Sequence, residues 1–146
     1  METGGRDMKK KAFVLLWLSA FLLLAGCQNA QVNQPDIPLT EAARQAMADP
    51  DAYIPYTADD LYDMIGISPD DYTEAVFFKD KDTLSGREII LVRGKDAQSI
   101  PGITKALEQY LSQRKEETRN YLPNAYRLLC DAAVQASGLT VSLIIQ

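Results

Sequence analysis

The sequence contains no histidine, one tryptophan and two cysteines. Histidine is the side chain whose ordinary pKa lies nearest to neutral pH, so its absence excludes Ser-His-Asp and Cys-His catalytic arrangements and the commonest zinc sites. The two cysteines are Cys27, directly after a long apolar run, and Cys130, near the other end of the sequence, and we do not expect them to form a disulfide. The apolar residues around Cys130 predict a small buried hydrophobe. The alternative, a reactive thiol, needs a base or cation nearby to lower its pKa.

Basic side chains are also scarce, since 15 lysines and arginines face 20 aspartates and glutamates. Residues 1–26 hold four of the basic and two of the acidic residues, which leaves residues 27–146 with a net charge of −7. A domain this acidic is repelled by phosphate backbones, and no basic patch with interleaved aromatic residues is present. We therefore expect no nucleic-acid partner.

Residues 1–26 have the pattern of a signal peptide. Lysines at positions 9–11 form a basic segment, and residues 12–24 follow with serine as the one polar side chain. A helix that crosses a bilayer needs about 20 apolar residues. This run is therefore too short to span a bilayer as a regular transmembrane helix, and it has the length of the hydrophobic region of a signal peptide. Met8, directly before the lysines, is an alternative start to Met1.

The segment ends in Leu24, Ala25, Gly26 and Cys27, which resemble the lipobox of bacterial lipoproteins. Small residues before the cut let the extended backbone enter a peptidase site, and the thiol accepts a diacylglyceryl group. The resemblance implies lipidation of Cys27, cleavage after Gly26 and a permanent anchor of two or three acyl chains, such as palmitate. We therefore expect a lipid-anchored protein on the extracytoplasmic face of the cell membrane. The alternatives are an ordinary signal peptide and an uncleaved signal anchor.

After the lipobox, residues 27–55 are expected to form a tether with one short helix, and residues 56–146 the folded domain. Residues 28–38 are rich in amides and contain two prolines, as flexible linkers do. Within the tether, Thr40 can cap a short helix. A second short helix is predicted from Thr57 as N-cap to a terminating Gly66.

The remaining sequence predicts an α+β domain with the element order ββαββ. Residues 72–78 and 88–93 are rich in aromatic and β-branched side chains around a polar turn, which is typical of a hairpin. An apolar stripe predicts a long helix over residues 101–120. Residues 129–135 and 139–145 predict a second hairpin, whose last strand alternates apolar and polar positions. We expect an antiparallel sheet of about four strands with the long helix packed on one face.

From about residue 57 to residue 145 the chain resembles a lipoprotein domain of Gram-positive bacteria, domain of unknown function 4358. The resemblance lies in Ile-Leu-Val at positions 90–92, the amphipathic helix, and Tyr-Leu-Pro-Asn at 121–124 before a hairpin around Gly138. Members often have Tyr or Phe where this chain has Leu139. The resemblance implies a surface lipoprotein and no particular activity.

The acidic residues have two chemical interpretations. A pair of carboxylates could hydrolyse glycosides, but no spacing singles out two of them. The turn after Asp80 has aspartates at the offsets of a calcium loop, but Leu84 and Leu91 stand where ligands are required. We therefore expect no metal, no cofactor and no catalysis. A cell-wall hydrolase that uses paired carboxylates is the alternative.

All seven tyrosines follow Cys27 in the sequence. Exposed tyrosines provide contact area for protein or glycan at small entropic cost. Tyr62, Tyr72 and Tyr110 are expected in the core, with their hydroxyls at its rim. Tyr53 and Tyr56, in an irregular stretch, are expected to be exposed and form the candidate binding surface. The sequence thus indicates a binding or envelope-accessory module for an unidentified envelope protein or glycan, with a structural spacer as a third interpretation.

Overall fold

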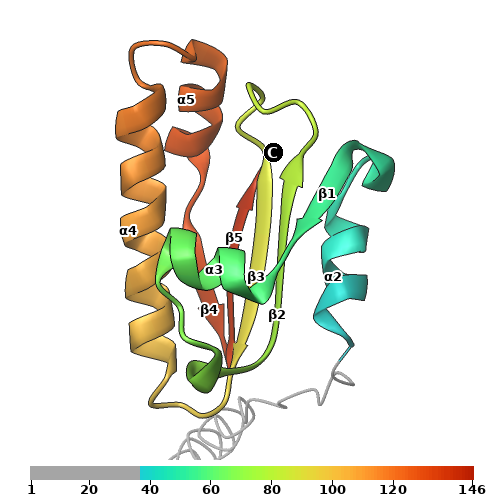
Figure 1. Cartoon of the computed structure of the whole chain (residues 1–146), viewed down its shortest axis with the longest axis vertical. Helices are drawn as coiled ribbons and strands as arrows, with labels where there is room; N and C mark the ends of the chain where they lie inside the picture. The colour runs from blue at the N-terminus through green and yellow to red at the C-terminus, as the bar shows by residue number, and fades with distance from the viewer. Residues whose placement is uncertain (1–36) are drawn as a thin grey trace, which may run out of the picture. The chain divides into compact units, whose positions relative to one another are not determined.

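The central element of the protein is an antiparallel sheet of five strands (Figure 1). The structure is a computed structural model that describes residues 37–146. The expected signal peptide, the lipobox and residues 27–36 of the expected tether lie outside these residues. The spatial order is β1-β2-β3-β5-β4, and all neighbours pair antiparallel. The strands are β1 (Tyr53–Tyr56), β2 (Tyr72–Asp80), β3 (Glu88–Gly94), β4 (Val134–Ser137) and β5 (Thr140–Ile145).

Within the described part of the chain, four α-helices flank the sheet (Figure 1). They are α2 (Leu39–Ala46), α3 (Ala58–Ile65), α4 (Ile100–Thr118) and α5 (Pro123–Asp131), with short 3-10 turns η2 (Pro50–Ala52) and η3 (Pro69–Asp71). The α+β class, the antiparallel sheet and the long helix on one face are confirmed. The sheet has one strand more than expected, because residues 53–56 form an edge strand beside β2. No helix in this part of the chain is long and apolar enough to cross a bilayer.

The main core lies between one face of the sheet and helices α3, α4 and α5. Val141, Leu143 and Ile145 alternate along β5 and are all 0% exposed. They meet Leu107 of α4 and Leu129 of α5, which are also fully buried. The alternation expected for the last strand is therefore confirmed, because side chains two residues apart point to the same face.

The opposite face of the sheet is covered by α2, so the folded part begins before residue 56. Leu39, Ala43 and Met47 follow one another at a spacing of four and bury against Ile89 and Leu91 of β3. Residues four apart lie on one face of a helix, so this stripe gives α2 a packing surface that a tether lacks. The helix begins at Leu39 after Pro38, and it has no side-chain cap, so the expected cap at Thr40 is wrong.

Residues 123–131 also differ from the expectation, since they form helix α5 and not the start of a strand. Pro123 stands in the first turn, a position that suits its missing N–H group. Ala125 and Leu129, four residues apart, are both 0% exposed. Cys130 lies on the other side of this helix and is exposed, so its expected burial is wrong.

The short helix α3 begins as the sequence predicts. The Thr57 hydroxyl accepts the Asp60 N–H at 3.1 Å, and the Asp60 carboxylate accepts the Thr57 N–H at 2.7 Å. The Thr57 hydroxyl also donates to this carboxylate at 2.7 Å, and the two bonds that Thr57 donates lower the pKa of Asp60. Gly66 ends the helix with φ of 80°, a conformation in which glycine has no steric penalty.

Candidate functional site

A groove of about 560 Å³ lies between the loop that joins β2 to β3 and the first half of α5. We call it the loop groove. One wall is formed by loop residues 82–87, and the other by residues 121–128. Both walls lie at the same end of the sheet, where β2 ends and β3 begins (Figure 1).

The loop wall is held in shape by its own aspartates. Asp80 accepts the N–H of Asp82 at 2.9 Å, and Asp82 accepts the N–H of Leu84 at 3.0 Å. Burial raises the pKa of Asp80, but hydrogen bonds from Asp82 and Ser85 and the Arg87 guanidinium outweigh it, so the pKa is lowered. The acids that suggested a calcium loop thus bind loop backbone. Nowhere within residues 37–146 do three potential metal ligands converge.

The loop and α5 are in direct contact beside the loop groove. Gly86 has φ of 76°, and a Cβ built on it would lie 2.7 Å from the Cβ of Ala125. Ala125 itself is 0% exposed. The close approach requires a residue without a side chain, so Gly86 both turns the chain and lets the two walls meet.

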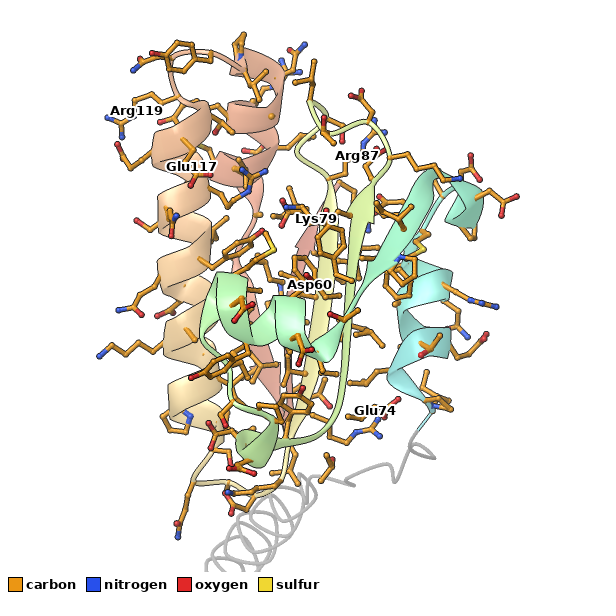
Figure 2. The ribbon with its side chains drawn as sticks, viewed as in Figure 1. Asp60, Glu74, Lys79, Arg87, Glu117 and Arg119 are labelled. Carbon is orange, nitrogen blue, oxygen red and sulfur yellow. The ribbon has the colours of Figure 1, made fainter. Side chains whose placement is uncertain are left out.

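Each wall of the loop groove carries a large side chain that faces solvent. Leu84 on the loop is 64% exposed, and Tyr121 before α5 is 83% exposed. Two arginines stand beside them: Arg87, which pairs with Asp80 at 3.4 Å, and Arg127, which is exposed on α5. Figure 2 shows Arg87 at the loop end of the hairpin and Arg119 near the end of α4. The lining of the loop groove therefore combines apolar side chains with two cations, and the groove is open to solvent.

A buried ion cluster lies beside the loop groove, where β3 meets α4. Glu88 is 1% exposed, and its Oε1 atom is 3.2 Å from Lys79 Nζ and 3.0 Å from an Arg114 nitrogen. Its Oε2 atom accepts the Tyr110 hydroxyl at 2.5 Å. Burial, and secondly the Glu88 charge, raise the pKa of Tyr110, so this hydroxyl remains a donor. Figure 2 shows Lys79 of this cluster on β2 and Glu117 on α4.

Both oxygens of Glu88 have partners in this cluster, which indicates a structural brace. The sequence itself indicates that Glu88 is buried beside a cation. Glu88, Ile90 and Val92 are two residues apart along β3, so their side chains point to the same face of the sheet. Ile90 and Val92 lie in the main core, and the Glu88 carboxylate is therefore directed into it. A buried carboxylate requires cations, and Lys79, directly opposite Glu88 in the hairpin, is one of them.

The structure does not bring the expected binding residues together. Tyr53 and Tyr56 are half-buried in β1, and residues three apart in a strand point to opposite faces. Tyr53 packs toward the α2 side, whereas the Tyr56 ring lies 4.9 Å from that of Phe77 on the other side. The prediction that Tyr53 and Tyr56 are exposed together on one surface is therefore wrong. Cys27, with the lipobox residues, lies outside the described residues.

Two of the tyrosines assigned to the core lie there. Tyr110 is 5% exposed, and Tyr72 packs against the main core, but Tyr62 is 54% exposed on α3. The side chains of the loop groove, Leu84 and Tyr121, were missed as a pair, because they belong to segments that meet only in the fold.

Comparison with protein families matches residues 50–146 to the family described as "Domain of unknown function (DUF4358)". No curated protein and no solved structure matched the chain. The matched region runs from η2 through β5, so it contains both walls of the loop groove and the Glu88 cluster. Since the match covers well over half of the sequence, the chain belongs to the DUF4358 family.

Proposed function

We propose that the protein is a lipid-anchored module of the cell envelope that binds a partner through the loop groove. The observation that carries this proposal is the exposure of Leu84 and Tyr121 on facing walls of one groove. Isolated exposed apolar residues are common, but apolar side chains gathered around a hollow are typical of interaction sites. Tyrosine also provides a large, stiff contact surface at small entropic cost.

The start of the folded domain is held far from the loop groove, which supports a partner that binds away from the anchored end. The Leu39 N–H donates to Glu74 at 2.6 Å, and Arg93 donates to the Ile37 carbonyl at 3.0 Å. Glu74 and Arg93 themselves pair at 2.7 Å. This clamp holds the start of the folded domain at the far end of the β2–β3 hairpin, which at strand rise is roughly 20 Å from the loop.

The proposed anchor agrees with this geometry. Cys27 precedes Ile37 by a stretch of chain that spans at most about 35 Å when fully extended. A lipid on Cys27 would therefore keep Ile37 within this reach of the bilayer, and the loop groove lies at the other end of the β2–β3 hairpin from the clamp. The occupant that we propose for the loop groove is a partner in the envelope space.

The carboxylates of the domain support recognition over hydrolysis. A glycosidase requires two carboxyl groups beside its substrate, one with a raised pKa. The loop groove is lined by one acid, Asp82, whose carboxylate accepts the Leu84 N–H. In Asp60, Asp80, Asp96 and Glu117 the pKa is instead lowered.

The proposal can be tested by photo-crosslinking in intact cells with the full chain. A photoreactive amino acid is placed at Leu84 or Tyr121, and at the matched exposed positions Leu139 and Tyr62 as controls. We expect one common adduct from the two groove positions, none from the controls, and loss of the adduct with Cys27→Ser. Adducts of equal yield from all four positions would show that the loop groove is not the binding site.

A further inference from the structure

The charge in the loop groove is opposite in sign to that of the chain. Its lining contains Arg87, Arg127 and Asp82, whereas the whole protein has a net charge of −5. The Asp82 carboxylate accepts a hydrogen bond from the backbone N–H of Leu84 in the loop. The Arg127 side chain is exposed and makes no hydrogen bond or ion pair with the described residues. The Arg87 side chain is 52% exposed, and its guanidinium donates one hydrogen bond, to Asp80, so most of the five guanidinium N–H groups are available.

The apolar part of the lining is mostly aliphatic. Leu84, Leu122, Pro123 and Leu128 contribute to it, and Tyr121 is the one aromatic ring. Sugar rings are recognised by stacking on aromatic rings and by dense hydrogen bonding to their hydroxyls. Aliphatic side chains of a peptide, in contrast, need only apolar contact. The lining therefore fits apolar side chains better than a glycan.

From this juxtaposition of two available guanidinium groups with an aliphatic groove, we propose that the occupant is a short extended segment of another envelope protein that carries both carboxylates and aliphatic side chains. Guanidinium groups bind carboxylates through paired hydrogen bonds, which sets the position of the segment. The volume of about 560 Å³ accommodates a few side chains and not a folded surface. This inference rests on the proposed function and names its partner.

The test uses the full-length lipidated protein, fluorescently labelled, in detergent micelles. The probes are two bead-bound octapeptide libraries. In the first, leucine, isoleucine or valine alternates with aspartate or glutamate. In the second, asparagine and glutamine replace the acids. We expect the protein to select beads of the acidic library at least tenfold more often than beads of the amide library.

Substitutions then locate the binding. On selected acidic peptides, Arg127→Gln is expected to weaken binding by between about twofold and fivefold, as loss of one solvent-accessible charge pair implies. Leu84→Ser is expected to weaken it at least as much through lost apolar contact. The controls Arg44→Gln and Leu139→Ser change exposed residues of the same types elsewhere and should leave affinity unchanged. All four side chains are exposed, so melting temperatures should stay close to that of the wild type.

Equal selection of the two libraries, or equal affinity of wild type and Arg127→Gln for the acidic peptides, would overturn the inference. So would tight binding of an N-acetylglucosamine oligomer that Tyr121→Ser abolishes while neither library binds, because the occupant would then be a glycan. If crosslinks from Tyr121 persist in cells while the acidic library is not selected, the proposed function stands and only the nature of the partner is wrong. Loss of the crosslinks as well would refute both.

Discussion

Replacement of Glu88 by glutamine tests whether the buried ion cluster holds β3 to α4. The substitution keeps the size of the side chain and removes its charge. It leaves Lys79, which is 19% exposed, and Arg114, which is 18% exposed, beside a neutral group. Breaking a fully buried ion pair costs about 3–5 kcal/mol. Because both cations retain some contact with water, we expect a loss of about 2–4 kcal/mol in the free energy of unfolding.

A loss of this size is a large part of the stability of an ordinary domain, which is about 5–15 kcal/mol. For a domain of about 100 residues it lowers the melting temperature by about 8–16 °C. The measurement is urea unfolding at pH 7, followed by circular dichroism, with thermal melts as a second readout. The slope of the free energy against urea should not change, because the surface exposed on unfolding is the same.

Glu117→Gln is the matched control. Glu117 pairs with the same Arg114 at 3.0 Å, but its side chain is 48% exposed. An exposed pair contributes at most about 1 kcal/mol, so this variant should differ little from the wild type. Equal destabilisation by the two substitutions would refute the reasoning, because the cost of Glu88→Gln would then not come from burial of the cluster.

Three further predictions follow from other parts of the molecule. Cys27→Ser is expected to abolish incorporation of an alkyne-labelled fatty acid in cells, and equal labelling of both proteins would exclude lipidation at Cys27. Gly86→Ala is expected to cost at least about 1–3 kcal/mol from the positive φ alone. Its added Cβ also meets Ala125, so urea unfolding should show a larger loss than Gly138→Ala, where φ is 56° and the space is open. The lowered pKa of Asp80 contributes stability that is present above the unfolded pKa of about 3.9 and is lost as pH falls through the folded pKa. Unfolding free energies from pH 7 to pH 3 should therefore fall in the acid range, less steeply in Asp80→Asn, and identical profiles would contradict the role of Asp80.

Local sequence patterns were sufficient for several elements. The Thr57 cap with Asp60 three residues later predicted α3, and the alternation in residues 139–145 predicted β5. These signals act between close neighbours in the chain, so no knowledge of distant residues is needed. The export signal and the lipid anchor at Cys27 were likewise inferred from linear sequence, and they stay predictions, because residues 1–36 lie outside the described part.

Tertiary packing decided what the local patterns left open. The stripe of Leu39, Ala43 and Met47 became a packed helix because the back of β3 offered Ile89 and Leu91 to bury it.

The two walls of the loop groove are likewise brought together only by the fold. Leu84 and Tyr121 lie on opposite sides of β3 and α4 in the sequence, and the contact of Gly86 with Ala125 places them around one groove. The sequence by itself thus determined the α+β class and the expectation of an anchor. The candidate site required the structure, because burial and surface shape depend on contacts between residues far apart in the chain.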